Sequence, residues 1–269
     1  MGQSLATMMG GKRSAIELRP GVVFPDWSAV RSPQAEEALG AHLAAIGFER
    51  RWSGYSAQED RVRRAILEGY LQLGVAPALP WLAERTGLLP EDALAIVRRL
   101  AARDLAVLDH DGDRIIVAYP FTDRPTEHRV RLGERTLQAV CALDALGVGS
   151  MCRADVVIDS RCRACERGVR LVTRQAGARL ATVDPRTTVV WSGLHYADGC
   201  AATSLCTVIA FFCSNAHLDV WRAEQRSDPR GYRLAPDDAL QVGRALFGPA
   251  LRSSPPARRA ATGGSRGTG

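Results

Sequence analysis

The stretch LQAVCALDALGVGSMC, residues 137–152, places a thiol and a carboxyl group, Cys141 and Asp144, in an apolar run typical of a buried helix. Residues three positions apart lie on one face of a helix, so both side chains can point into the same pocket. A thiolate can attack a substrate or bind a metal, and a nearby carboxyl group can give or take a proton. The pair alone is weak evidence for a site, because Cys and Asp at this spacing also occur by chance.

The chain has an odd number of cysteines, which argues against a framework of disulfides: Cys141, Cys152, Cys162, Cys165, Cys200, Cys206 and Cys213. In a cytosolic protein these thiols stay reduced, so catalysis or metal binding outranks disulfide formation. Cys206 precedes the apolar run VIAFF and becomes informative only if it faces Cys141; otherwise it is a core residue. Cys213 follows the same run, and we expect it to be a small buried hydrophobic residue.

Cys162 and Cys165, in SRCRACERG, form a C-x-x-C pair that could be half of a zinc site or a redox pair. A closed zinc site needs four ligands, and the sequence has no second C-x-x-C and no H-x-x-x-H. Cys152 and Cys200 could complete the set only at irregular spacing. We therefore expect structural or accessory thiols first. No ligand spacing links the histidines, which we expect on the surface or in loops: His42, His110, His128, His195 and His217.

Residues 59–122 carry the pattern of a winged-helix-like module. Three helical patterns, at 59–74, 79–87 and 89–104, precede two short strands around the Asp111–Gly112 turn. A winged helix suggests DNA binding, but between residues 59 and 120 eight arginines face ten acidic residues. The third helix begins with acidic residues and the wing reads DHDGD, whereas neutralising phosphates requires positive charge. We therefore expect no nucleic-acid partner.

The second half of the chain predicts a small, mainly antiparallel mixed-sheet domain with flanking helices, so the fold class is α+β. Strand-like runs occur at 154–160, 168–173, 178–183, 187–193 and 205–213, and closing helices near 216–226 and 236–248. We assign this domain to residues 123–252 and expect a linker at 122–136 before the helix that carries Cys141. Residues 1–58 are an N-terminal extension with one helix near 32–48 and no evident chemistry. Residues 253–269 are expected to be a disordered tail.

Composition is compatible with a globular protein of 269 residues, 46% hydrophobic. No apolar run reaches the roughly 18 residues of a membrane span, and the N-terminus lacks a secretory signal. We therefore expect a cytoplasmic protein without membrane contact. Four of the six net positive charges lie in the C-terminal segment from Leu251, which includes the predicted tail: Arg252, Arg258, Arg259 and Arg266. The basicity is mostly a property of the tail and does not indicate nucleic-acid binding.

The order of these parts resembles the organomercurial (alkylmercury) lyase family. The resemblance covers about residues 59–250 and depends on the winged-helix-like prefix, CALD at 141–144, SRCRACERGVRL at 160–171 and LCTVIAFF at 205–212. It implies an enzyme of mercury detoxification that cleaves carbon–mercury bonds by protonolysis to a hydrocarbon and Hg(II). Cys141 and Cys206 match the two catalytic cysteines, Asp144 the catalytic aspartate, and Cys162 a further, structural cysteine. Thr207 departs from the family where a second adjacent cysteine can occur.

The resemblance also implies how the residues would act. Two soft thiolates would hold Hg(II) transiently, together with the carboxyl group, and Asp144 would relay a proton to the leaving carbon. No organic cofactor is expected, but free thiols are needed for turnover. Expected partners are the organomercurial substrate and, as Hg(II) acceptors, cellular thiols and a mercuric reductase; we expect a monomer. The alternatives are a thiol-based, metal-sensing winged-helix regulator and a zinc-stabilised domain without catalysis.

Overall fold

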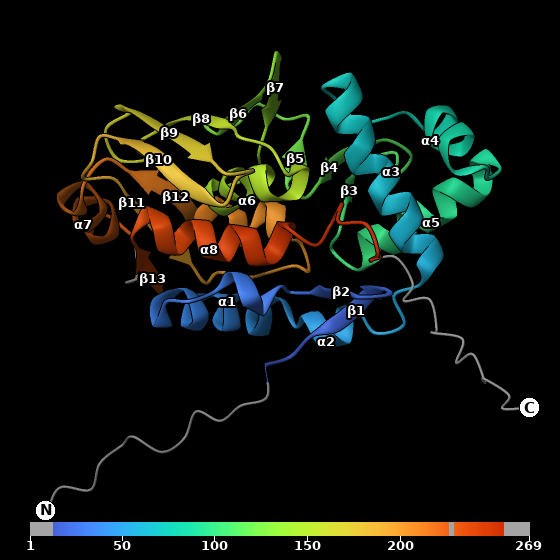
Figure 1. The fold of residues 1–269 in the computed structure, drawn as a ribbon, viewed down its shortest axis with the longest axis horizontal. Coiled ribbons are helices and arrows are strands. Elements are labelled where there is room, and N and C mark those ends of the chain that lie inside the picture. Colours follow the sequence, from blue (N-terminus) through green and yellow to red (C-terminus); the bar gives the residue numbers. More distant parts are fainter. Residues whose placement is uncertain (1–12, 226–228, 256–269) are drawn as a thin grey trace, which may run out of the picture.

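The computed structural model describes residues 13–225 and 229–255 (Figure 1). Within these ranges, helices combine with four β-sheets whose strand pairs are all antiparallel, so the α+β class is confirmed. Among the same residues, no helix has the length and apolar character needed to cross a bilayer. The tail predicted to be disordered lies outside the described residues from position 256 onward.

The N-terminal segment packs into the common hydrophobic core. It comprises β1 (Ile16–Arg19), β2 (Val22–Phe24), a short 3-10 turn, α1 (Pro33–Ile46) and α2 (Phe48–Arg51). Helix α1, predicted from the sequence, begins where the Ser32 hydroxyl accepts a hydrogen bond from the Ala35 amide at 3.0 Å. It ends at Gly47, whose left-handed backbone suits glycine. Figure 1 shows α1 lying along α8, which it contacts.

The next segment gathers three helices at one end of the molecule: α3 (Ala57–Leu73), α4 (Leu79–Thr86) and α5 (Pro90–Ala102) (Figure 1). Helix α3 begins with a capping box between Ser56 and Glu59. A three-stranded sheet follows, formed by β3 (Val107–Leu108), β4 (Ile115–Ala118) and β5 (Phe121–Thr122). The predicted order of three helices and a hairpin is therefore present.

The remaining residues form two sheets and three helices. The five-stranded sheet has the order β10-β9-β8-β6-β7 and contains β6 (Arg129–Leu132), β7 (Arg135–Gln138), β8 (Val157–Arg161), β9 (Gly168–Arg174) and β10 (Arg179–Asp184). The three-stranded sheet has the order β12-β11-β13 and contains β11 (Val189–Gly193), β12 (Ile209–Phe212) and β13 (Gly231–Leu234). The helices are α6 (Ala142–Cys152), α7 (Asn215–Ala223) and α8 (Pro236–Phe247).

Two sequence expectations were wrong in this region. The segment predicted as a linker, 122–136, contains β6 and most of the β6–β7 hairpin, because Val130 and Leu137 pair across it and are buried. The strand predicted from Leu205 begins only at Ile209, because Leu205–Val208 forms a 3-10 turn. This turn sets the direction in which Cys206 points.

Helices α6 and α8 cross at unusually short range, and this crossing supports the segment that carries Asp144. A Cβ atom added at Gly243 of α8 would lie 2.7 Å from the Leu143 carbonyl oxygen and 2.9 Å from the Gly147 nitrogen. A Cβ added at Gly147 would lie 2.7 Å from the Gly243 carbonyl oxygen. The backbone atoms among these cannot rotate away, and a Cβ at Gly147 would also lie 2.4 Å from the Phe247 side chain. Glycine at both positions is therefore what allows α8 to pack on the first turns of α6.

We expect Gly243→Ala and Gly147→Ala each to lower the free energy of unfolding by about 1–3 kcal/mol or more, because the added methyl group forces the two helices apart. Gly40→Ala is the matched control, since Gly40 also lies within a helix but a Cβ added there would have no neighbouring atom within 4 Å. Removing a glycine from an open helical position should stabilise the protein by up to about 1 kcal/mol. Urea unfolding of the three variants measures this; equal effects at all three positions would contradict the argument.

Candidate active site

The structure brings Cys141, Asp144 and Cys206 together. Their sulfur and carboxylate atoms all lie within 4.8 Å of one another, and the Cys206 Sγ is 3.9 Å from an Asp144 oxygen. The three side chains are only 2%, 3% and 7% exposed. Two thiols and one carboxyl group that are far from solvent can bind a soft metal ion and exchange a proton with whatever it carries.

The local backbone differs from the expected shared helix face. Cys141 has an extended conformation and is the N-cap residue of α6, while Asp144 lies in the first helical turn. Both side chains therefore sit at the helix N-terminus, where the partial positive charge of the backbone favours a thiolate and a carboxylate. Cys206 reaches them from the 3-10 turn that precedes β12.

Burial controls the protonation of this group. Burial raises the pKa of Asp144 to about 7, although hydrogen bonds with the two cysteines pull the pKa down. The pKa of Cys141 is raised by burial as well. The pKa of Cys206 lies well above its usual value because its thiol hydrogen-bonds toward Cys141 and is buried. Near neutral pH the carboxyl group can therefore act either as an acid or as a base.

A cavity of about 110 Å³ opens onto the three residues. That is several times the roughly 10–15 Å³ that one water molecule needs. Its walls are mainly apolar, and the residues before position 121 contribute as much as the later ones. Residues of the predicted extension on this wall are Phe24, Leu43, Ile46 and Trp52. Sequence reasoning found no chemistry in that extension, because a wall residue contributes surface and has no characteristic spacing.

The Phe24 and Trp52 rings strengthen this wall. The two rings stack with centroids 4.3 Å apart, and the Arg63 guanidinium lies 5.1 Å from the centre of the Trp52 ring. Stacked aromatic side chains with a cation on one face resist rearrangement. The N-terminal segment thus supplies a rigid apolar side to the cavity.

Asp104, which sequence reasoning missed, holds a second side of the cavity in place. Its carboxylate accepts hydrogen bonds from the Tyr119 hydroxyl at 3.1 Å, the Tyr196 hydroxyl at 2.9 Å and the Ala201 amide at 3.0 Å. Burial raises the pKa of Asp104, and these hydrogen bonds oppose the rise. The loop at 196–201 is therefore tied to the end of α5. No sequence pattern links residues so far apart.

His42 and His217 lie in helices α1 and α7, against the expectation that the histidines lie on the surface or in loops; His128 lies in a loop before β6, as expected, but is buried. His42, in α1, lines the cavity and is 4% exposed; its Nε2 lies 3.0 Å from the Ser192 hydroxyl. Burial lowers the pKa of His42 to about 4. His128 is 1% exposed, and burial lowers the pKa of this residue to about 3. Both rings are neutral at physiological pH and serve as packed polar groups.

Cys162 lies outside the trio formed by Cys141, Asp144 and Cys206. Its side chain is fully buried in a second group, at the other end of β12, with three partners: Cys165, Cys213 and His217. Cys152 and Cys200, which the sequence had left as irregular ligands for the C-x-x-C pair, belong to neither of the two clusters found among the described residues. Cys213 is 3% exposed, as expected, but has thiol and imidazole neighbours in addition to apolar ones.

Comparison with known proteins shows which proteins this chain is similar to. Residues 121–248 match the model of the alkylmercury lyases. The alkylmercury lyase of Staphylococcus epidermidis (strain ATCC 12228 / FDA PCI 1200) is 28% identical over 165 residues, which cover 61% of this chain and 72% of that protein. The chain thus resembles the alkylmercury lyases. The mercury-bound crystal structure of MerB2 shares the fold, with a TM-score of 0.65, 24% identity and coverage of 81% of this chain and 100% of that one.

The region that matches the alkylmercury lyase family covers only part of the site. Residues 121–248 contain Cys141, Asp144 and Cys206, whereas Trp52 and Asp104 lie before the matched region. The resemblance inferred from the sequence is therefore confirmed for the segment that carries the reactive groups. The N-terminal residues that line the same cavity lie outside the matched region, residues 121–248.

The raised pKa of Asp144 makes a testable contribution to stability. The pKa of a free aspartate is 3.8 and that of Asp144 about 7, so the folded state holds the proton more tightly. Ionising the carboxyl group then destabilises the fold, and stability falls as pH rises from about 4 to about 7. Asp144→Asn removes this dependence, so the variant should gain up to about 4 kcal/mol over wild type between pH 4 and pH 8.

Urea unfolding of wild type and Asp144→Asn at pH 4, 6 and 8 measures the difference. Because the amide has nearly the shape of the protonated carboxyl group, the two proteins should have similar stability at pH 4 and diverge above it. Parallel stability curves across this range would show that Asp144 titrates normally.

Proposed function

We propose that the chain cleaves the carbon–mercury bond of organomercurials by protonolysis, with Cys141, Asp144 and Cys206 as catalytic residues. The observation that supports this most strongly is the convergence of two buried thiols and one carboxyl group of raised pKa in an apolar cavity. Similarity to the alkylmercury lyases suggests the reaction class. The products would be a hydrocarbon and protein-bound Hg(II).

The proposed reaction begins when one thiol binds the mercury of the substrate. The S–H bond breaks as the S–Hg bond forms, and Asp144 takes the proton, which the pKa near 7 allows. The second thiol binds in the same way, and its proton leaves with the displaced ligand of mercury. Asp144 then protonates the carbon as the C–Hg bond breaks, with the bonding electron pair remaining on carbon. Mercury stays Hg(II) throughout, so no redox partner is involved.

The cavity explains why these steps belong in a buried site. Mercury is a soft ion and prefers thiolate sulfur to water or carboxylate oxygen. An apolar wall keeps water away from the carbon that is being protonated and accommodates the organic group. Every acid, base and ligand of the scheme is a side chain of this protein, so we propose that no organic cofactor takes part.

Product release requires exchange of Hg(II) onto other thiols. A buried ion held by two sulfurs leaves by stepwise attack of free thiols, so cellular thiols and a mercuric reductase are the proposed acceptors. All seven cysteines are free, which agrees with the proposed cytoplasmic location, where thiols remain reduced. We propose that the protein acts as a monomer, since the described residues already enclose the cavity.

We propose further that residues 59–122 form a winged-helix-like module whose role is to close the cavity. Arg63, Leu105 and Tyr119 of this segment lie on the cavity wall. We retain residues 1–58, 123–252 and 253–269 as the proposed extension, catalytic domain and tail. The contribution of Phe24 and Trp52 to the wall gives the extension a part in substrate enclosure.

The three catalytic residues should act as one unit. We expect Cys141→Ala and Cys206→Ala each to abolish hydrocarbon release, and the double variant to be scarcely worse than either. Asp144→Asn should still bind the organomercurial, because both thiols remain, but release hydrocarbon roughly 10²–10⁴-fold more slowly because an amide cannot relay a proton. Single-turnover release in excess free thiol, with mercury stoichiometry, measures both effects.

Cys152→Ser is the matched control, because Cys152 lies at the opposite end of α6 from the trio. It should release hydrocarbon like wild type. Hydrocarbon release at a near-normal rate by folded Cys206→Ala or Asp144→Asn would contradict the mechanism. Absence of release by wild type with both alkyl and aryl mercurials would leave the reaction itself unsupported.

We propose that residues 59–122 close the cavity and do not bind DNA. We expect no binding to mixed-sequence duplex DNA at physiological salt, because acidic residues outnumber basic ones between positions 59 and 120. Fluorescence anisotropy across a range of salt concentrations tests this. Tight binding that disappears when the exposed Arg98 and Arg99 are changed to Ala would favour the regulator alternative.

A further inference from the structure

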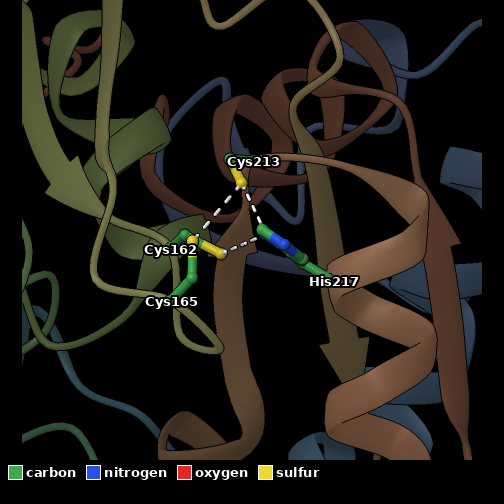
Figure 2. Close-up of side chains that lie close together, drawn as sticks. All are labelled: Cys162, Cys165, Cys213 and His217. Carbon is green, nitrogen blue, oxygen red and sulfur yellow. Dashed lines mark hydrogen bonds between the residues drawn. The ribbon is translucent and has the colours of Figure 1, made fainter.

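A second group of metal-ligand side chains lies away from the catalytic trio. Cys162, Cys165, Cys213 and His217 have the spacing C-x₂-C and C-x₃-H, and their ligand atoms all lie within 4.8 Å of one another. Figure 2 shows the three sulfurs and the imidazole turned toward a common centre. We propose that these four residues form a structural zinc site with three thiolate ligands and one imidazole ligand.

The distances suit a tetrahedral ion. Bonds of about 2.3 Å to sulfur and about 2.0–2.1 Å to nitrogen place tetrahedral ligands roughly 3.8 Å apart for two sulfurs and roughly 3.6 Å apart for sulfur and nitrogen. The Cys165 and Cys213 sulfurs are 3.7 Å apart, and the Cys162 sulfur is 3.8 Å from the His217 Nδ1. The Cys213 sulfur lies closer to Nδ1, at 2.8 Å, and this pair must separate by less than an ångström to admit the ion.

The backbone holds the first ligand pair in place. The turn after β8 is closed by two hydrogen bonds, from the Cys162 amide to the Arg167 carbonyl at 2.8 Å and from the Glu166 amide to the Cys162 carbonyl at 2.9 Å. The amides of Cys213, Ala164 and Cys165 turn toward the Cys162 sulfur and fix its position. This turn presents Cys162 and Cys165 on the same side.

The second pair comes from a different part of the fold. Cys213 immediately follows β12, and the Ser214 hydroxyl caps α7 by accepting a hydrogen bond from the His217 amide at 3.2 Å. One helical turn then brings the imidazole back over Cys213. The Arg163 amide also donates to the Phe211 carbonyl at 3.0 Å, so the two pairs are joined through the backbone. An ion here would link the β8–β9 turn, β12 and α7.

The donor set points to zinc in a structural role. Three sulfurs and one nitrogen complete a tetrahedron and leave no open position for a substrate, as in closed zinc sites. The cluster contains no carboxyl group that could relay a proton, unlike the catalytic trio. Strand β12 separates the two, since Cys206 precedes it and Cys213 follows it. The site goes beyond the proposed lyase function and does not depend on it.

The test begins with the full-length protein purified under reducing conditions without chelators. Elemental analysis should find one zinc ion per chain, and X-ray absorption should find three sulfur ligands at about 2.3 Å and one nitrogen at about 2.0–2.1 Å. Cys165→Ser and His217→Ala should lose the zinc and lower the melting temperature. His217→Cys supplies a fourth thiolate and should keep both. Cys152→Ser controls for loss of an unrelated cysteine and should retain one zinc ion.

The outcomes separate this proposal from the lyase mechanism. Zinc that persists in Cys141→Ala and Cys206→Ala but not in Cys165→Ser supports the site, whether or not hydrocarbon release is observed. Wild-type protein that contains no zinc and fails to take Zn(II) from a chromogenic chelator overturns it. Loss of zinc from Cys206→Ala with retention in Cys165→Ser also overturns it. A disulfide between two of the cluster cysteines in the reduced preparation would do the same.

Discussion

The burial of the Asp144 carboxyl group is the constraint on which the rest of the site depends. Moving a carboxylate out of water is costly, so burial raises the pKa of Asp144 and favours its protonated form. The groups that lower the pKa are the thiols of Cys141 and Cys206, which hydrogen-bond to the carboxyl group, and no ion pair with a described residue contributes. This protonation balance exists only while water is excluded. The close crossing of α6 and α8 and the aromatic wall around Trp52 maintain that exclusion.

The cavity wall draws on a larger part of the chain than the proposed reactive groups do. The reactive groups all lie between residues 121 and 248, the region that matches the family, whereas much of the apolar wall precedes it. Wall residues need only fill space, so many side chains can do the same work there. Ligands and proton carriers need defined atoms at defined distances. The matched region, residues 121–248, contains all the proposed reactive groups but only part of the apolar wall.

Two sulfur-rich groups lie at opposite ends of β12, and their donor sets assign them different tasks. The trio has two sulfurs and a carboxyl group facing a cavity, which leaves room for a substrate and supplies a proton carrier. The second cluster has four ligands that close on one another across three elements, which suits a structural ion. In our proposals, β12 thus positions the catalytic Cys206 at one end and the zinc ligand Cys213 at the other.

The sequence by itself determined what depends on near neighbours: the α+β class, a helix near 32–48, most strands, and the CALD segment with its resemblance to the alkylmercury lyases. Tertiary structure decided which distant groups meet. Cys206 reaches Asp144, Asp104 binds Tyr196, and His217 joins Cys162 only because packed strands and helices bring them together. Spacing along a chain reports contacts within a turn or hairpin, whereas contacts across dozens of residues are set by the packing of the whole core.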